Sequence, residues 1–256
     1  MMEKLLENKK ILIAGAGGLL GANLVSEVLE QGASVIAADL NVAGLKECLL
    51  SKGVNVNSKD IELIELDITD ESSVENIFFN HDFNGAVNAT YPRNKEYGKH
   101  FLDVSLNSFN ENLSLHLGSA FLFSQQAAAY FIRKGEPFSL VNISSIYGVV
   151  APDFDIYSNT SMTMPVEYAA IKAAILHLNK YIVSYVKNSD FRINSVSPGG
   201  IYDGQPEIFL NAYKEKTNGK GMLSVKEVLG GVMFLLSEQS RYITAQNIVV
   251  DDGFSL

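Results

Sequence analysis

Residues 11–21 read ILIAGAGGLLG, an apolar run that passes directly into closely spaced glycines. The apolar run predicts a short buried strand, and the apolar positions of residues 22–31 predict a helix after the glycines. Gly15, Gly18 and Gly21 have the spacing G-x-x-G-x-x-G between this strand and this helix. Because glycine permits a tight turn and a close approach to the N–H groups at a helix start, the stretch predicts a cradle for a diphosphate. A structural turn without a ligand is the alternative, and the strand and helix on either side favour the diphosphate site.

Strand-like and helix-like runs alternate along the rest of the chain, with the period of about 30 residues that suits a doubly wound fold. Further strands are predicted over residues 35–38, 61–66, 85–88, 139–143, 191–196 and 247–250, and helices over 72–80, 105–133, 165–188 and 225–236. The strands are near-continuous apolar runs, which is typical of a parallel sheet buried on both faces. The sequence therefore predicts an α/β fold over residues 1–256, a single dinucleotide-binding domain. Its Rossmann-type, doubly wound parallel sheet would be flanked by helices on both faces.

Two longer segments, residues 91–104 and 150–166, interrupt this alternation. Loops of that length in a compact domain usually have a function or move. We expect both of them beside an active site at the carboxyl ends of the strands.

Composition excludes several classes of protein. The 256 residues are 47% hydrophobic, which is enough for a large core. No run approaches the roughly 20 apolar residues of a spanning helix, and the short acidic start does not resemble a signal peptide. A net charge of −9 without a basic block disfavours nucleic acid and anionic membranes as partners. Cys48 is the single cysteine and the four histidines are scattered, so we expect no disulfide, no metal, and a soluble, reduced, cytoplasmic protein.

Asp39 ends the second predicted strand, about 20 residues after the glycine turn, where a carboxylate can accept hydrogen bonds from the adenosine ribose hydroxyls. The same carboxylate repels a 2′-phosphate, and the nearby Asn41 offers no positive charge to offset that repulsion. A solvated aspartate at a strand end is the alternative. Together with the glycine turn, Asp39 favours NAD over NADP.

A second group of residues points to proton transfer. Ser144 and Ser145 follow the strand over 139–143, and the spacing of Tyr168 and Lys172 places them on one helix face. The ordinary tyrosine pKa of about 10 is high for a proton donor and acceptor near pH 7, and a nearby ammonium lowers it. A serine hydroxyl can orient a substrate oxygen, so this set suits proton transfer paired with hydride transfer at a carbonyl or alcohol. Tyr-x-x-x-Lys alone is common in helices, so the assignment depends on the whole pattern.

That whole pattern resembles the short-chain dehydrogenase/reductase family over essentially the full chain. The matching elements, in order, are the glycine turn, Asp39, Asp67, Asn88-Ala89, Ser145, Tyr168-x-x-x-Lys172, the string 197–200 and the ending 246–253. The resemblance implies that Tyr168 is the acid/base and that Ser145, rather than Ser144, is the catalytic serine. Lys172 would hold the nicotinamide ribose and lower the tyrosine pKa.

The resemblance also implies a set of cofactor contacts. They are Gly15, Gly18, Leu19 and Leu20 at the diphosphate turn, Asp39 at the adenosine ribose, Asp67 and Ile68 at the adenine, Asn88 and Ala89 at the cofactor ribose, Tyr168 and Lys172 at the nicotinamide ribose, and Pro198, Gly199 and Ile201 at the nicotinamide.

Several positions depart from the family pattern: Ala14 replaces a threonine, Leu19 replaces the glycine of shorter members, and Thr90 follows Asn88-Ala89 where a glycine is usual. His116 stands where an asparagine normally supports a proton-relay water. A histidine can hold a water and can titrate near neutral pH, and a buried packing histidine is the alternative. We expect a relay or structural role for His116 in place of the asparagine.

Substrate contacts are expected from the longer segments. A basic cluster in residues 93–100, which includes Arg93, could steer an anionic substrate such as a phosphate, although a solvated charged loop explains it equally well. Tyr91 begins this loop and is expected to face the substrate. Tyr157 lies in an insertion whose hydroxyl and amide groups suit a sugar. The stretch 202–222 matches the variable substrate lid of the family.

Four strings, residues 91–95, 146–152, 162–168 and 250–256, are similar to bacterial flagellin-modification oxidoreductases. That resemblance implies a sugar phosphate or nucleotide-linked sugar, on the route to amino-sugar and nonulosonate precursors of surface glycans. One alternative is a 3-oxoacyl-carrier-protein reductase, which predicts the NADPH preference that Asp39 disfavours. Another is a non-catalytic dinucleotide-binding sensor or scaffold, which the intact Ser145, Tyr168 and Lys172 disfavour.

The family usually assembles through its two long helices, which implies a homodimer or homotetramer. The apolar positions expected to serve there are Phe121, Phe123, Ala127, Tyr130, Ile175, Leu178 and Ile182. Core packing explains these residues equally well.

Overall fold

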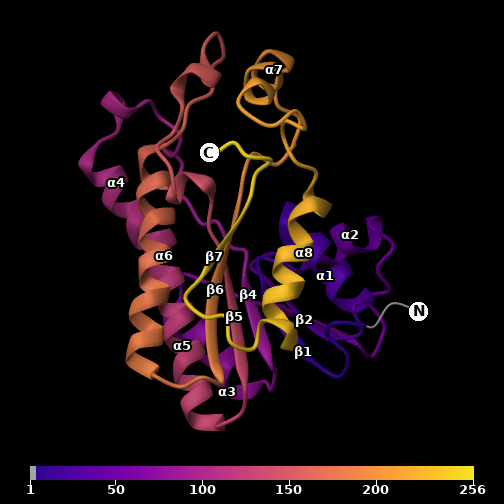
Figure 1. The fold of residues 1–256 in the computed structure, drawn as a ribbon. Coiled ribbons are helices and arrows are strands. Elements are labelled where there is room, and N and C mark those ends of the chain that lie inside the picture. The colour runs from indigo at the N-terminus through magenta and orange to yellow at the C-terminus, as the bar shows by residue number, and fades with distance from the viewer. Residues whose placement is uncertain (1–3) are drawn as a thin grey trace.

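The computed structural model describes residues 4–256; residues 1–3, which begin the acidic start and the expected domain 1–256, lie outside the described residues. Within the described part, seven strands form one sheet in the order β3-β2-β1-β4-β5-β6-β7 (Figure 1). The strands are β1 (Lys10–Ala14), β2 (Ser34–Asp39), β3 (Ile61–Glu65), β4 (Gly85–Asn88), β5 (Phe138–Ile143), β6 (Phe191–Pro198) and β7 (Asn247–Val250). Every neighbouring pair is parallel, which confirms the doubly wound Rossmann-type sheet.

Helices cover both faces of this sheet, as expected from its apolar strands (Figure 1). One side carries α1 (Leu19–Glu30), α2 (Val42–Ser51) and α8 (Val225–Leu236), and the other carries α3 (Glu71–Asn80), α5 (Ser119–Lys134) and α6 (Val166–Val186). Successive side chains of a strand point to opposite faces. Ile11 therefore packs in the cluster of α1 and α8, whereas Leu12 packs in the cluster of α3 and α5. None of the helices in residues 4–256 combines the length and apolar character needed to cross a membrane.

Some elements differ from the sequence-based expectation. The helical stretch 105–133 is divided into α4 (Leu106–Asn112), a π-helical turn η2 (Leu113–Gly118) and α5. The expected loop 202–222 contains a helix, α7 (Glu207–Glu215). No bounds were predicted for the short helix α2, whose apolar stripe is interrupted by Gly44 and by charged residues.

The residues expected at an oligomer interface lie mostly inside the molecule. Phe123, Ala127, Tyr130, Ile175 and Ile182 are all buried in the described structure. Apolar residues at helical spacing indicate that one face of a helix is buried. In this protein, that face is covered by its own sheet and neighbouring helices. Phe121 is 47% exposed.

The glycine turn between β1 and α1 is shaped by two close backbone contacts. Gly15 has a φ of +79°, and a Cβ there would lie 2.9 Å from the Ala89 carbonyl oxygen. A Cβ at Gly21 would lie 2.0 Å from the Gly15 carbonyl oxygen, well inside van der Waals contact. Only glycine at both positions allows α1 to start against the turn and the turn to rest on the end of β4.

We predict that Gly21→Ala destabilises the protein by about 2–3 kcal/mol, because the added methyl group must displace backbone rather than a flexible side chain. At this chain length the melting temperature should fall by roughly 5–10 °C. Gly230→Ala in α8 is the matched control, since a Cβ there meets nothing within 4 Å. The control should leave the melting temperature unchanged or raise it slightly. Thermal unfolding of the two variants tests this, and equal melting temperatures would contradict it.

Candidate active site

The carboxyl ends of β1, β4, β5 and β6 meet at one edge of the sheet, and a cavity of about 690 Å³ opens there. Its lining unites most of the residues expected at the site: Gly18, Leu19, Leu20, Ala89, Tyr91, Arg93, Ser145, Tyr157, Tyr168, Lys172, Pro198, Gly199 and Ile201. Gly15, Asp39, Asp67, Ile68, Asn88 and His116 are not among the lining residues. Tyr147, Phe209 and Met222 also line the cavity, although none of them was singled out from the sequence. Phe209 and Met222 lie within the predicted lid stretch 202–222. For Tyr147, the available signal was its proximity to Ser145 in the sequence.

Lys172 connects α6 to the end of β5. Its Nζ donates a 2.9 Å hydrogen bond to the Ile143 carbonyl oxygen, and it lies 5.4 Å from the centroid of the Tyr168 ring. The Ser144 hydroxyl donates to the Lys172 carbonyl oxygen at 3.0 Å, so Ser144 fastens the strand end to α6. Ser144 and Ser145 both line the cavity, and Ser145 is the serine that hydrogen-bonds with the Tyr168 hydroxyl. The two serines thus differ in their partners, since Ser144 bonds to the backbone of α6 and Ser145 bonds to the tyrosine.

Burial dominates the ionisation of this pair. Burial lowers the pKa of Lys172 to about 7. Burial also raises the pKa of Tyr168, and the hydrogen bond with Ser145 acts in the opposite direction. The lowered tyrosine pKa expected from the nearby lysine is therefore not found. The physical reason is that desolvation of a phenolate outweighs the attraction of an amine that is itself only partly charged near neutral pH.

His116 lies behind Lys172 on the π-helical turn and is 3% exposed. Its Nε2 is 3.4 Å from the Lys172 Nζ, and its Nδ1 has no hydrogen-bond partner among the described residues. Burial and the positive charge of Lys172 lower the pKa of His116 to about 2. The imidazole is therefore neutral across the physiological range, so the titration near neutral pH considered above is not found. A neutral ring whose Nε2 accepts from an ammonium carries its hydrogen on Nδ1.

Tyr91 and Arg93 cover the tyrosine–lysine pair from the side of β4. The Tyr91 ring lies edge-on to the Tyr168 ring, with 5.5 Å between the centroids. The Arg93 Cζ lies 4.8 Å from the centroid of the Tyr91 ring. Asn94 holds this segment on α4, because its backbone N–H donates to Asn112 Oδ1 at 3.0 Å and its side-chain amide donates to Glu111 at 2.8 Å. Of the basic cluster in residues 93–100, Arg93 alone is in the lining of the cavity.

The start of α1 and the end of β2 fit a dinucleotide. In the described structure no side chain caps the first turn of α1 at Gly18, so its N–H groups remain available to an anion. Asp39 accepts the Gly17 N–H at 2.8 Å through Oδ2 and the Asn41 N–H at 3.1 Å through Oδ1. A Cβ at Gly17 would lie 3.0 Å from Asp39 Oδ2, so glycine permits this approach. The chemistry of these donors and this carboxylate matches a diphosphate and a ribose.

The adenine contacts expected from the resemblance lie beyond Asp39. Asp67 and Ile68 follow β3, the strand next to β2, at the same edge of the sheet. The Asp67 Oδ1 accepts the Thr69 N–H at 2.9 Å. Asn88, at the end of β4, accepts the Thr90 hydroxyl at 2.7 Å and is buried.

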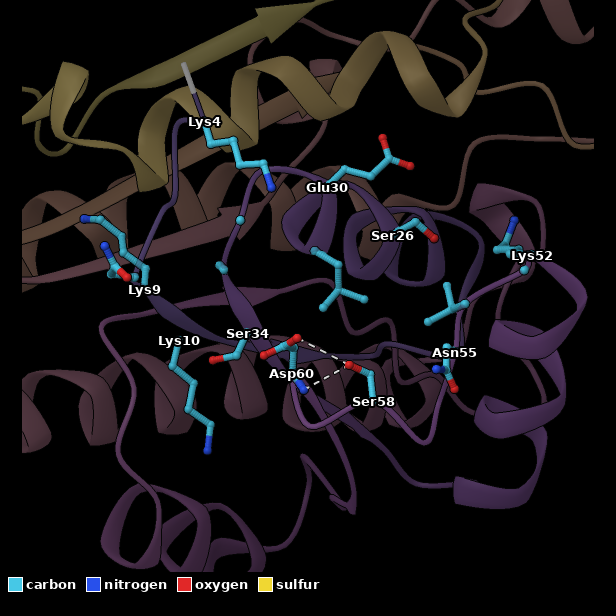
Figure 2. Close-up of a pocket in the computed structure, with 16 residues that line it drawn as sticks. Lys4, Lys9, Lys10, Ser26, Glu30, Ser34, Lys52, Asn55, Ser58 and Asp60 are labelled. Carbon is cyan, nitrogen blue, oxygen red and sulfur yellow. Dashed lines mark hydrogen bonds between the residues drawn. The ribbon is translucent and has the colours of Figure 1, made fainter. Parts of the chain in front are cut away.

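A second cavity of about 640 Å³ lies at the opposite edge, where β1 and β2 begin. Figure 2 shows its rim of lysines around Ser34 and Asp60. Two of these lysines are neutralised at the surface, since Lys9 pairs with Glu238 at 2.6 Å and Lys10 pairs with Glu62 at 3.2 Å. None of the site residues expected from the sequence lines this cavity, so the candidate site is the cavity at the carboxyl edge.

Comparison with known proteins agrees with this geometry. A family model described as enoyl-(acyl carrier protein) reductase matches residues 15–255. The chain is 38% identical to post-translational flagellin modification protein A of Campylobacter coli, over 98% of this chain and 100% of that protein. It is 28% identical to 7α-hydroxysteroid dehydrogenase of Bacteroides fragilis, over 98% of this chain and 95% of that one.

Solved structures extend the comparison to three dimensions. The crystal structure of a short-chain dehydrogenase from Leptospira borgpetersenii with bound NAD+ is 31% identical, with a TM-score of 0.86, and the match covers 100% of this chain and 96% of that one. Together, the nearly full-length family match, the 38% identical relative and the shared fold establish that the chain belongs to the short-chain dehydrogenase/reductase family of oxidoreductases.

Proposed function

We propose that the protein is an NAD(H)-dependent enzyme that moves a hydride to or from a hydroxyl or keto group of an anionic sugar. The single observation that carries this proposal is the union of Ser145, Tyr168 and Lys172 with the cation of Arg93 in one cavity. The 38% identity to a flagellin modification protein supports a sugar phosphate or nucleotide-linked sugar used in flagellin modification. The family relative with bound NAD+ supports the choice of cofactor.

Each residue of the cavity has a separate role in the proposed reaction. Bound NAD supplies the hydride acceptor, and NADH supplies the hydride in the reverse direction. Ser145 orients the substrate oxygen, and Tyr168 holds or releases the proton at its hydroxyl. The raised pKa of Tyr168 keeps it protonated near pH 7, the form that donates to a keto oxygen. Lys172, with a pKa of about 7, can exchange a proton beside it. His116 accepts from Lys172 and fixes its position, the role we propose in place of the family's asparagine.

The substrate class follows from the spacing of the polar groups. Tyr91 separates the cation from the acid/base, with its ring 4.8 Å from Arg93 Cζ and 5.5 Å from the Tyr168 ring. Because Arg93 and Tyr168 both line this cavity, an anion bound at Arg93 and a reacting oxygen at Tyr168 can belong to one substrate. The Tyr147 and Tyr157 hydroxyls, 3.2 Å apart, are buried in the wall of the same cavity and can bind ring hydroxyls.

The three segments expected to hold the substrate, residues 91–104, 150–166 and 202–222, each contribute to the wall of the cavity. We propose that they enclose the substrate. We also propose a homodimer or homotetramer in which α5 and α6 meet a second copy. In place of the buried residues named earlier, that contact would use the exposed Phe121, Tyr181 and Tyr185.

Tyr168→Phe should reduce turnover by a factor of about 10² to 10⁴, because it deletes the proton-carrying hydroxyl and keeps the ring. The affinity for NADH should remain near that of the wild type. Tyr242→Phe, at a tyrosine that is 83% exposed and does not line the cavity, is the control and should leave both quantities unchanged. Steady-state rates and NADH fluorescence titrations measure the two effects. Unchanged turnover in Tyr168→Phe would refute the acid/base assignment.

Asp39→Ala should weaken NADH binding about 10- to 100-fold, as expected for the loss of charged hydrogen bonds to the ribose. It should strengthen NADPH binding, because the repulsion of the 2′-phosphate is removed. Asp60→Asn, at the opposite edge of the sheet, is the control for a lost carboxylate. Parallel titrations with NADH and NADPH test the expectation. A wild-type protein that binds NADPH more tightly than NADH would contradict it.

A further inference from the structure

Three segments distant in the sequence form a continuous cap over the cavity. They are the short helix η4 (Phe154–Tyr157), helix α7 and the chain end 251–256. In Figure 1, α7 and the C-terminus lie at the same end of the molecule, beyond the carboxyl ends of the strands. The Tyr157 and Phe209 rings are 5.2 Å apart between centroids, and an ion pair of 2.8 Å joins Lys216 to Asp153. The cap is therefore one packed unit.

Tyr213 lies at the centre of this unit. Its side chain is 2% exposed, and its ring stacks on Phe254 with 4.6 Å between centroids and 19° between planes. Its hydroxyl accepts the backbone N–H of Gly200 at 2.6 Å. The phenol therefore joins the cap to the loop that leaves β6.

The two glycines of this loop are pressed against the same phenol. A Cβ at Gly199 would lie 2.8 Å from the Tyr213 hydroxyl oxygen, and a Cβ at Gly200 would lie 3.0 Å from the Tyr213 ring. On the other side, the Gly199 N–H donates to the Val250 carbonyl oxygen at 2.8 Å. The path of this loop is thus fixed between β7 and the cap.

The same loop faces the cavity. Pro198, Gly199 and Ile201 all line it, and they are the residues assigned above to the nicotinamide. Tyr213 lines the same cavity, and its bond to the Gly200 N–H places it to set the position of this nicotinamide wall. The cap that carries Tyr213 is therefore also a wall of the substrate space.

We propose that Tyr213 is a positioning residue, which holds the loop 198–201 in the form that receives the nicotinamide half of the cofactor and thereby couples docking of the cap to cofactor binding. This inference rests on the proposed NAD(H) binding. Linkage requires the coupling to be reciprocal, so an undocked cap weakens nicotinamide binding and a bound nicotinamide favours the docked cap. The adenosine half, at Asp39 and the start of α1, lies outside this coupling.

Tyr213→Phe deletes the acceptor of the Gly200 N–H and keeps the ring in place. We expect the Kd for NADH to rise about tenfold or more, because a buried N–H loses its partner and the loop loses its preferred path. The Kd for ADP-ribose, which lacks the nicotinamide, should stay within twofold of the wild type. Calorimetric titration of the full chain with NADH and with ADP-ribose gives the ratio of the two constants. A merely structural role of Tyr213 would not change that ratio.

Tyr130→Phe is the matched control. The Tyr130 hydroxyl is also buried and also accepts a backbone N–H, that of Phe83 at 3.0 Å, but it lies near the amino end of β4. This control should lower the melting temperature without changing the ratio of the two constants. Phe254→Leu, which removes the stacking partner of Tyr213, should change the ratio in the same direction by a smaller factor, and it decides the question if Tyr213→Phe does not fold.

Two results would overturn the proposal. If the wild-type protein binds both ligands and Tyr213→Phe leaves the ratio of the two Kd values unchanged, the coupling is refuted and the proposed function stays intact. If the wild-type protein binds neither NADH nor ADP-ribose, the proposed NAD(H) function is refuted, and the coupling with it.

Discussion

The rest of the site depends on the close packing of the β1–α1 turn against the start of α1 and against the backbone that follows β4. Gly21 rests against the Gly15 carbonyl group, and Gly15 rests against the backbone of Ala89, with no space for a Cβ at either position. These contacts bring the uncapped start of α1 to the end of β4. Tyr91 follows the end of β4 by three residues and its ring reaches Tyr168 on α6, and Arg93 lies over the same Tyr91 ring. These two backbone contacts thus set the distance between the diphosphate cradle and the residues that would hold the proton and the substrate anion.

Burial then determines how the assembled groups ionise. Lys172 is enclosed by the Ile143 carbonyl group, His116 and the ring of Tyr91, and its pKa falls to about 7. Desolvation raises the pKa of Tyr168 in the same enclosure. Both groups are therefore driven toward their neutral forms, which is the expected effect of a low-dielectric site without a fixed counter-charge. A charged substrate or cofactor that enters the cavity would change this balance.

Much of the fold could be predicted from the sequence because parallel strands buried on both faces are unbroken apolar runs. The bounds of β4 and β7 agree with the prediction to the residue. The residues of the cavity could be anticipated because they follow strand ends or glycines in the chain. What could not be predicted depends on tertiary contacts. The pKa values of Tyr168 and His116 follow from burial that no spacing reveals, and the role of Tyr213 follows from a contact between a lid helix and a loop. The face of α5 that contains Phe123 was ambiguous for a related reason, since an apolar period does not say whether a sheet or a second copy covers it.

The central claim is that Arg93 selects an anionic sugar and that Ser145, Tyr168 and Lys172 support hydride exchange between that sugar and NAD(H). The most direct measurement is the rate of NAD reduction by the purified protein with paired sugars that differ only in the presence of a phosphate or nucleoside diphosphate group. The account predicts turnover with NAD and a kcat/KM at least about tenfold higher for the anionic member of one pair, a factor worth about 1.4 kcal/mol. The account would be contradicted if no sugar supported NAD reduction and the protein instead oxidised NADPH selectively with an acetoacetyl thioester.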